Sequence, residues 1–359
     1  MKALKENLIL AINPGSTSTK LALYKNDVKI LKETIRHDRE VILSFENRYA
    51  EKDYRIGLVL DFLKRSNYKL EEIDIFVGRG GLVRPLESGT YLINEAMIED
   101  LKEAKYGDHA SNLGVIIAYE LAKKVSKKAY TVDPVVVCEL SKEAKVSGFN
   151  GIEKLSIFHA LNHKAVAKRY AKEINKPYKN LTLVVAHLGG GISVGLHKGG
   201  KVVDVNNAFG GEGPFTLERS GTLPVFGLLE YAFKEKKDIK QLKQLFVTKA
   251  GISSYLGNKS GIELTKQIDN DDKEALFYLE AMSYNVIKAI GSLCFVAKCK
   301  VDAIILTGGL ADNKYVIRYL KSHIPKNFKV VIYPEEDELL ALKDGIVRVI
   351  NKEEKLKHY

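Results

Sequence analysis

Residues 8–30, LILAINPGSTSTKLALYKNDVKI, begin with two strand patterns joined by a short polar turn. The apolar run at 8–12 predicts a buried strand, and the alternation at 20–25 predicts a second one. An Asn-Asp dipeptide then marks a turn into a third strand at 28–35. The chain therefore opens with three consecutive strands, and the loop between the first two is rich in Gly, Ser and Thr.

The same order of elements returns in the second half of the chain. Residues 181–186 predict a strand, 187–191 a glycine-rich turn, 192–197 a strand, and 201–206 a further strand after a Gly-Gly turn. Three residue pairs align at one constant offset between the halves: Leu10 with Leu183, Leu23 with Leu196, and Lys25 with Lys198. A repeat that spans nearly half the chain predicts a duplicated fold.

The rest of the chain mixes strand and helix patterns. Strands are expected at 73–78, 129–134, 302–306 and 329–334, and helices at 38–66, 94–105, 111–126, 157–174, 225–247, 272–298 and 336–350. No segment rich in Pro, Ser or charge separates the two halves. We therefore expect an α/β protein with an N-terminal domain at 1–150 and a C-terminal domain at 151–339.

Length and composition exclude several classes of protein. The 359 residues are 45% hydrophobic and 28% charged, so the chain buries large cores and is not disordered. No run of about 18 apolar residues is present, so we expect no membrane-spanning segment and no membrane partner. Three cysteines without a CxxC pair indicate reduced thiols in a cytoplasmic protein rather than a disulfide framework.

The net charge of +11 does not indicate a nucleic-acid partner. The lysines are scattered along amphipathic segments, and no block of five consecutive basic residues is present. Arginine suits bidentate recognition of phosphate or carboxylate. The chain has only 11 arginines, so their positions are informative. Arg79, Arg84 and Arg219 stand in loops rich in Gly or Pro, and most of the other eight are interpreted as surface positions in helices.

Three loops that contain Gly follow predicted buried strands. The first, NPGSTSTK at 13–20, is either an anion-binding loop or a polar hairpin turn. It lacks the GxxxxGK[ST] pattern and no helix follows it, which disfavours a P-loop NTPase. The second is HLGGG at 187–191, and the third is TGG at 307–309. Because two of these loops occupy duplicated positions, we expect a nucleotide held between the two halves.

Several polar residues at predicted strand and helix ends have two interpretations each. His159 and His163, four residues apart on a predicted helix, could hold a metal, but no Glu lies between them as in HExxH. Alternatively, His159 faces a loop and bonds an anion, or both are ordinary packed histidines. Asp133 ends a strand where open α/β sheets bind ligands, or it forms an Asp-Pro turn. The four acids at 335–338 favour a helix N-terminus, or one of them binds Mg²⁺.

Together these segments resemble the acetate/butyrate kinase family, part of the superfamily of acetate and sugar kinases, actin and heat-shock chaperone ATPases. The resemblance covers essentially the whole chain and rests on NPGSTSTK, GRGG, DHASNLG, VDPVVV, SIFHALNHK, VVAHLGGGIS, ERSGTLP and LTGGLADN. The chain is most similar to butyrate kinases, since INPGS, GRGG and HLGGG stand where acetate kinases have INAGS, HRVVHGG and HLGNG. An actin-like fold is implied, with two ribonuclease H-like halves, an interdomain cleft, and a C-terminal helix at about 340–359 that completes the first half.

The resemblance also implies which residues bind ATP or ADP and Mg²⁺. Arg79 and Arg219 are expected to flank the transferred phosphoryl group, with Asp133 and His159 beside it. Nucleotide and phosphate contacts are implied for Asn13, Ser16, Ser18, Lys20, His187, Gly189, Gly190, Gly191, Gly308, Gly309 and Leu310. Metal contacts are implied for Asn13 and for Asp337 or Glu338. The segment SSYLG at 253–257 departs from the SSDxR pattern that acetate kinases have near the adenosine.

The implied reaction is reversible phosphoryl transfer between ATP and butyrate, which gives ADP and butyryl phosphate, an acyl phosphate of fermentation. A short-chain carboxylate is ionised at pH 7, so the nucleophile needs no general base. Positioning and charge neutralisation therefore carry the catalysis, with in-line attack on the γ-phosphoryl group. Gly80 and Gly81 replace bulkier residues of acetate kinases and, with Phe158, are expected to leave room for a longer acyl chain.

Other functions stay open at this point. An acetate, propionate or branched-chain acid kinase is the nearest alternative, and a sugar kinase would need an Asp base for its hydroxyl substrate. A chaperone-like or filament ATPase belongs to a different class, but the length leaves little room for extra domains. A polyanion-binding protein is the last alternative. Because similar kinases are homo-oligomers, a homo-oligomer is expected.

Overall fold

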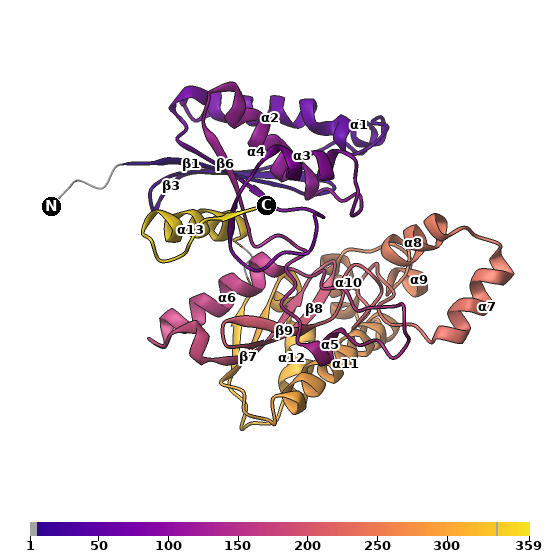
Figure 1. The fold of residues 1–359 in the computed structure, drawn as a ribbon. Helices are drawn as coiled ribbons and strands as arrows, with labels where there is room; N and C mark the ends of the chain where they lie inside the picture. Colours follow the sequence, from indigo (N-terminus) through magenta and orange to yellow (C-terminus); the bar gives the residue numbers. More distant parts are fainter. Residues whose placement is uncertain (1–5, 335–336) are drawn as a thin grey trace. The chain divides into compact units, whose positions relative to one another are not determined.

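The computed structural model describes residues 6–334 and 337–359. The chain divides into two compact units, and each is described by itself. Unit 1 lies within Met1–Val137 and Asp337–Tyr359, and unit 2 lies within Cys138–Glu336 (Figure 1). The C-terminal segment therefore belongs to the N-terminal unit, and residues 138–150, expected in the first domain, are grouped with unit 2.

Unit 1 is built on a seven-stranded mixed sheet. Its strands are β1 (Leu8–Pro14), β2 (Ser18–Lys25), β3 (Val28–Arg36), β4 (Ile75–Arg79), β5 (Thr90–Leu92), β6 (Lys128–Val132) and β12 (Lys357–His358). β1, β2 and β3 are antiparallel neighbours, and β4 and β6 run parallel to β1, in the order β12-β5-β6-β4-β1-β2-β3. Every residue of β1 is buried, which explains why its sequence is an apolar run rather than an alternation.

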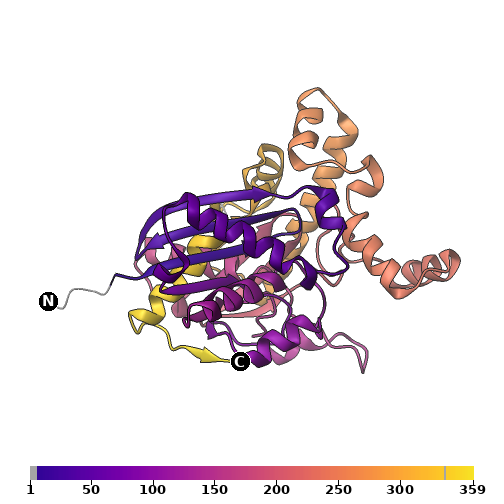
Figure 2. The same ribbon diagram turned by 90° about the horizontal axis from the view of Figure 1, so that it is seen from above.

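Helices cover both faces of this sheet. They are α1 (Arg39–Leu43), α2 (Lys52–Arg65), α3 (Glu95–Lys102), α4 (Asn112–Lys124) and α13 (Glu338–Ile350), with 3-10 turns η1 (Tyr49–Glu51) and η2 (Leu70–Glu72). Figure 1 shows α2 and α4 on one face and α13 on the other. α4 lies so close to β4 that a Cβ on Gly78 would be 2.0 Å from the carbonyl oxygen of Gly114. In Figure 2 the yellow α13 crosses the sheet before the chain ends in β12.

Unit 2 has a five-stranded sheet that repeats the strand order of unit 1. Its strands are β7 (Thr182–Leu188), β8 (Ile192–Lys198), β9 (Lys201–Val205), β10 (Ala303–Thr307) and β11 (Val330–Tyr333). β7, β8 and β9 are antiparallel, and β10 and β11 run parallel to β7, in the order β11-β10-β7-β8-β9. The two sheets even share an irregularity, because the second and third strands slip in register at Leu23/Tyr24 and at Leu196/His197. The predicted duplication is thereby confirmed.

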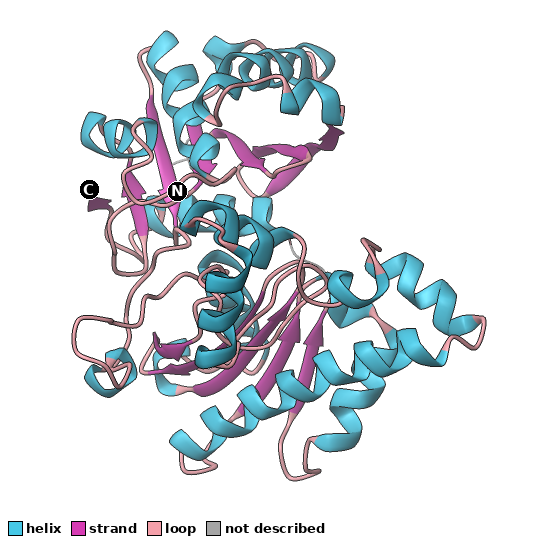
Figure 3. Cartoon of the chain, turned by 90° about the vertical axis from the view of Figure 1, so that its right-hand side faces the viewer, coloured by secondary structure: helices cyan, strands magenta, loops and turns pink. Residues whose placement is uncertain are grey.

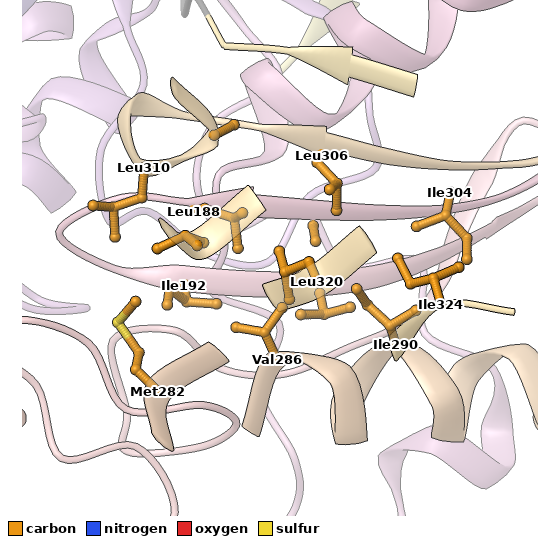
Figure 4. Close-up of a cluster of buried hydrophobic side chains, with 14 of the residues drawn as sticks. Leu188, Ile192, Met282, Val286, Ile290, Ile304, Leu306, Leu310, Leu320 and Ile324 are labelled. Carbon is orange, nitrogen blue, oxygen red and sulfur yellow. The ribbon is translucent and has the colours of Figure 1, made fainter. Parts of the chain in front are cut away.

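Unit 2 is layered as helix, sheet and helix (Figure 3). Beyond α6 (Ala160–Glu173) and the long α11 (Lys273–Val296), its helices are α5 (Lys142–Lys145), α7 (Val225–Glu235), α8 (Ile239–Thr248), α9 (Ser253–Leu256), α10 (Gly261–Asp269) and α12 (Lys314–His323), with turns η3 (Tyr178–Asn180) and η4 (Gly309–Asp312). α6 packs on one face of the sheet through Val166 and Tyr170. α11 packs on the other face through Met282, Val286 and Ile290, together with α12 (Figure 4).

α11 is the one helix in the described part of the chain that is long and apolar enough to cross a membrane. Its residues Ala275, Leu279, Met282 and Val286 are buried in the core of unit 2. One apolar face of α11 therefore belongs to the core of unit 2.

The predicted elements differ from the structure in a few places. The single helix expected at 38–66 consists of α1, η1 and α2. The Asp38 side chain caps the start of α1, which ends at Leu43, and α2 begins at Lys52. β5 and β12 are two or three residues long, too short for any periodicity to reveal them. After the third Gly loop the chain forms η4, and a regular helix begins only at Lys314.

Candidate active site

The first group of predicted site residues lies where three parallel strands of unit 1 end. Asn13 lies near the end of β1, Arg79 is the last residue of β4, and Asp133 follows β6. Because the three strands are parallel neighbours, their carboxyl ends meet at one edge of the sheet, which is where open α/β sheets bind ligands. The structure thus brings these three residues to the same edge.

Asn13, Arg79 and Glu338 form a closed triangle of polar contacts. Asn13 Nδ2 donates to Glu338 Oε2 at 2.5 Å, and Arg79 Nη1 donates to Asn13 Oδ1 at 3.4 Å. Arg79 Nη2 pairs with Glu338 Oε1 at 3.0 Å. Asn13 and Glu338 are buried, and Arg79 Nε is a buried donor with no hydrogen-bond partner among the described residues. The guanidinium is therefore held in place with one donor unused.

Asp337 and Glu338, the alternative metal ligands, have different surroundings. Asp337 Oδ1 caps α13 by accepting from the backbone N of Leu340 at 3.1 Å, and Asp337 Oδ2 pairs with Lys32 at 3.1 Å. Glu338 Oε2 instead accepts from Asn13 Nδ2, and the amide oxygen of Asn13 faces Arg79, so a carboxylate and an amide group lie side by side. Mg²⁺ prefers such hard oxygen donors and completes its shell with water and phosphate oxygens, so this pair fits the metal. Of the other two acids, Glu335 and Glu336, the structure describes neither.

Asp133 is buried and has a backbone φ of +40°, a left-handed conformation that is uncommon for residues other than Gly. Its Oδ1 accepts from Ser88 Oγ at 2.6 Å and from the backbone N of Gly89 at 2.8 Å. These two hydrogen bonds fix the carboxylate at the sheet edge, and the chain turns after it, where the backbone N of Val137 donates to the carbonyl of Pro134 at 3.0 Å.

A buried arginine supports the first Gly loop from behind. Arg55 Nη1 donates to the carbonyl oxygens of Gly15 at 3.0 Å and Ser18 at 3.3 Å, and to Thr19 Oγ1 at 3.0 Å. Arg55 Nε and Nη2 bond Glu51 Oε2 at 2.9 and 2.6 Å. The side chain is 0% exposed, so the interpretation of the helix arginines as surface residues is wrong for Arg55. The signal that could have found it is the acid four residues earlier, since Glu and Arg at i and i+4 meet on one helix face.

Three other predicted residues of this loop are partly or fully exposed. Ser16 is exposed, and Ser18 and Lys20 are half-buried. The backbone N–H of Gly15 donates to the carbonyl of Ser18 at 2.7 Å and closes the turn, and Lys20 pairs with Asn13 across the hairpin. Hydroxyl groups and an ammonium group at a tight turn are donors of the kind that bind phosphate oxygens.

The second group of predicted site residues lies in unit 2 and surrounds Gly191. His159, the residue before α6, stacks on His187 with ring centroids 3.6 Å apart and an interplanar angle of 7°. A Cβ on Gly191 would lie 2.6 Å from Arg219 Nη1 and 3.1 Å from His159 Cε1, so the loop needs Gly for both side chains to approach it. The structure thus brings together four residues that the sequence predicts from three separate segments.

Arg219 is held in place by its own loop. Its Nη1 donates to the carbonyl of Ala208 at 2.7 Å, and its guanidinium lies 5.5 Å from the centre of the Phe209 ring. Burial lowers the pKa of Arg219, and the charge of Glu218 opposes this effect. An arginine nevertheless stays protonated at neutral pH, so a fixed positive charge lies beside the second Gly loop.

Two polar residues that the sequence analysis missed connect the loops of unit 2. Thr216 Oγ1 donates to the carbonyl of Gly190 and accepts from the backbone N of Arg219, both at 3.0 Å. Asn162 contacts His187 Nδ1 through Oδ1 at 2.9 Å, and its Nδ2 donates to the last residue of β10 at 3.3 Å. No motif or spacing marks a single Thr in a loop or a single Asn in a helix, so the sequence holds no signal for either.

The glycines of the second and third loops fall into two classes. Gly308 has a φ of +91°, and a Cβ there would lie 2.5 Å from the carbonyl oxygen of Leu188, so packing between loops accounts for it. Gly190 and Gly309 have open space on their Cβ sides and leave backbone accessible. Leu310, expected beside the adenosine, packs in the hydrophobic core of unit 2.

His159 and His163 do not share a metal ion. Ser193 Oγ lies between them, 3.0 Å from His159 Nδ1 and 2.9 Å from His163 Nε2. The other nitrogen of His163 contacts His197 Nε2 at 3.2 Å. Within the described ranges, no group of three His, Cys, Asp or Glu side chains could hold a metal. The Ser193 hydroxyl group therefore lies between the two rings, where the metal interpretation placed an ion.

Gly80 and Gly81 do not leave empty space on their Cβ sides. A Cβ on Gly80 would lie 2.5 Å from Pro134 Cβ, and one on Gly81 would lie 2.3 Å from Asn112 Oδ1. Phe158 is buried and packs edge-on against an imidazole, that of His163, with centroids 5.1 Å apart. The expected extra room at the two glycines is therefore not found, because neighbouring side chains fill that volume.

Comparisons with known proteins agree with this arrangement. The acetokinase family profile matches residues 8–357. Acetate kinase of Porphyromonas gingivalis is 20% identical, with a TM-score of 0.73 over 95% of this chain and 99% of that one. A propionate kinase of Francisella tularensis is 18% identical (TM-score 0.76, 94% and 98% covered), and acetate kinase of Entamoeba histolytica is 16% identical (0.74, 94% and 98%). The chain therefore has the two-domain fold of acetate kinases and actin-like ATPases.

Proposed function

Since the chain belongs to the acetokinase family, a family of short-chain carboxylate kinases, we propose that its substrate is butyrate and that it converts ATP and butyrate reversibly to ADP and butyryl phosphate. One observation carries the proposal: each half of the duplicated fold contains a buried polar cluster that includes an arginine. Arg79 belongs to the cluster of unit 1 and Arg219 to that of unit 2.

The chemistry of the reaction sets what these clusters must do. A carboxylate oxygen attacks the γ-phosphorus, the bond from that phosphorus to the β–γ bridging oxygen breaks, and ADP leaves. The nucleophile is already ionised at neutral pH, so no proton has to be removed. The obstacle is repulsion between the carboxylate and the triphosphate, and fixed positive charges and hydrogen-bond donors lower it.

The described side chains match these needs. We assign Arg79 and Arg219 to the oxygens of the transferred phosphoryl group and His159 to a hydrogen bond with one of them. Asp133 orients the metal or the acid substrate. The nucleotide phosphates are assigned to the loop 13–20, with Ser16, Ser18 and Lys20, and to the loop 187–191, and the adenosine is assigned to the loop 308–310.

Mg²⁺ would be held by Asn13 and Glu338, and when bound it supplies further neutralisation of the phosphate charge. We expect Glu338→Gln to raise the Mg²⁺ concentration needed for half-maximal activity by at least about tenfold. The matched control is Asp337→Asn, because Asp337 caps α13 and pairs with Lys32. Titration of activity with Mg²⁺ measures the half-maximal concentration for both variants. A larger increase for Asp337→Asn than for Glu338→Gln would make Asp337 the metal ligand in place of Glu338.

The preferred acid follows from the segments that resemble butyrate kinases. We expect the highest kcat/KM with butyrate when acetate, propionate, butyrate and isobutyrate are compared by hydroxamate trapping of the acyl phosphate. A methylene buried in an apolar site contributes about 0.8 kcal/mol, so rates that rise from acetate to butyrate would show that the acyl chain is buried when bound. Acetate or propionate is the second candidate, favoured by the solved structures of kinases with those names. A maximum at acetate would overturn the choice of butyrate.

We also propose a homo-oligomer in the cytoplasm, with neither nucleic acid nor membrane as a partner. No residue of α7 is buried, and Phe226 and Phe233 are 80% and 81% exposed. An apolar helix of this kind is the surface that a second copy of the chain would cover. All three cysteines are free thiols, which fits a reducing compartment.

A further inference from the structure

Five side chains form a continuous series of hydrogen-bond contacts through unit 2 that ends at His159, and we call this series the file. Tyr178 OH contacts His197 Nδ1 at 2.8 Å, and His197 Nε2 contacts His163 Nδ1 at 3.2 Å. His163 Nε2 contacts Ser193 Oγ at 2.9 Å, and Ser193 Oγ contacts His159 Nδ1 at 3.0 Å. The three central side chains are 0% exposed. Of the five, only His159 has a role in the proposed reaction.

Burial favours the neutral form of both histidines inside the file. Burial lowers the pKa of His163 well below its ordinary value, and the nearby His187 adds to the effect. Burial likewise lowers the pKa of His197, to which His163 and Lys164 contribute. Lys164 itself pairs with Glu139 at 2.6 Å.

When each group of this file donates one hydrogen bond and accepts one, neutral imidazoles allow two orders of protons along it. Each neutral ring has one N–H donor and one bare nitrogen acceptor, and a hydroxyl group can do both. If Tyr178 donates to His197, every hydrogen points toward His159, whose Nδ1 accepts and whose own proton is on Nε2. If the order is reversed, His159 donates from Nδ1 toward Ser193.

The phenol at the far end selects between the two orders. Tyr178 OH contacts an imidazole nitrogen, His197 Nδ1. A phenol hydroxyl is a stronger donor than an imidazole N–H, and its oxygen is a weaker acceptor than a bare imidazole nitrogen, because the ring withdraws electron density from the oxygen. The order that begins with donation from Tyr178 is thereby favoured.

We propose that Tyr178, His197, His163 and Ser193 are positioning residues that hold His159 as the tautomer with its proton on Nε2. This inference rests on the proposed function, in which His159 donates to an anionic phosphoryl oxygen. The Nε2–H tautomer presents a donor to that oxygen, whereas the other neutral tautomer presents a lone pair on Nε2, which would be repelled. The file thus connects a half-buried tyrosine with the reacting group.

The direct test is the tautomer of His159, read from the ¹⁵N shifts of its ring in the whole ¹⁵N-labelled protein at pH 7.5. The signals are assigned by their loss in His159→Gln. We expect a pyrrole-type Nε2 and a pyridine-type Nδ1 in the wild type. A pyrrole-type Nδ1 would overturn the proposal. This readout needs no substrate, so failure of the file and failure of the proposed kinase activity can be told apart.

The variant that tests the file is Tyr178→Phe, which removes one hydroxyl group and keeps the ring. We expect a mixture of His159 tautomers and a fall in kcat of about tenfold with KM unchanged; a wholly wrong tautomer of a catalytic His costs up to about 10⁴ in the serine proteases. The matched control is Tyr333→Phe, which loses a hydroxyl contact with Glu173 outside the file and should change neither readout. Wild-type tautomers and kcat in Tyr178→Phe would overturn the proposal.

Discussion

Arg219→Ala is expected to lower kcat for butyryl phosphate formation by at least about 10³ while the protein keeps its fold. An arginine that stabilises the charge of a transferred phosphoryl group is worth roughly 10³–10⁵ in rate. The guanidinium is held by the carbonyl of Ala208 and lies against the Gly191 backbone, and Thr216 holds the backbone N–H of Arg219. Coupled measurement of ADP release at saturating ATP and butyrate gives kcat, and circular dichroism reports the fold.

Two further variants show whether the loss of kcat comes from the guanidinium of Arg219 in particular. Arg219→Lys keeps the charge but loses the planar fork, so we expect only partial recovery of kcat. Arg169→Ala removes an exposed arginine that pairs with Glu173 on the surface of α6, and it should leave kcat within about twofold. A near-normal kcat in Arg219→Ala would show that Arg219 does not stabilise the transferred phosphoryl group.

Glu51→Ala is expected to lower the free energy of unfolding of unit 1 by about 3–5 kcal/mol, because it leaves the Arg55 guanidinium buried without its counter-charge. Burial already lowers the pKa of Arg55, and the hydrogen bond with Glu51 is what opposes this effect. Arg55 also holds the carbonyls of Gly15 and Ser18, so the loosened loop should raise the KM for ATP as well. Urea unfolding, followed by the signals of unit 1 residues, measures the loss.

The matched control for this pair is Glu33→Ala. Glu33 pairs with Arg65 at 2.9 Å in the same unit, but both side chains are largely exposed. Exposed pairs contribute about 0–1 kcal/mol, so the control should be nearly neutral. Equal, small losses of unfolding free energy in Glu51→Ala and Glu33→Ala would show that the buried pair of Glu51 and Arg55 stabilises unit 1 no more than the Glu33–Arg65 pair does.

The sequence predicts the sheets of both units well because their decisive strands are buried. β1 and β7 stand out as apolar runs, and the loops after them contain the glycines and hydroxyl residues from which a phosphate site was inferred. The cluster residues Arg79, Arg219 and His187 were likewise marked, by scarcity of arginine or by a neighbouring Gly run. These signals are local, so a single chain without structure reveals them.

What the sequence could not predict depends on contacts between distant segments. Asn13 and Glu338 are 325 residues apart, and residue patterns alone do not pair them; only the resemblance to a family implied that the C-terminal helix completes the first half and that both residues serve one metal. Ser193 and Asn162 are buried polar residues whose roles come from the histidines beside them. Gly80 and Gly81 suggested an open pocket, but Pro134 and Asn112 fill that volume. An absent side chain therefore does not show where the empty space lies.

The most direct test of the central claim, phosphoryl transfer from ATP to a carboxylate, uses butyrate labelled with ¹⁸O in its carboxyl group. Mass spectrometry of the products is expected to show butyryl phosphate that retains both ¹⁸O atoms, with one ADP formed per acyl phosphate and no ADP without the acid. Release of ADP and inorganic phosphate at the same rate with and without butyrate would contradict the claim and indicate an ATPase.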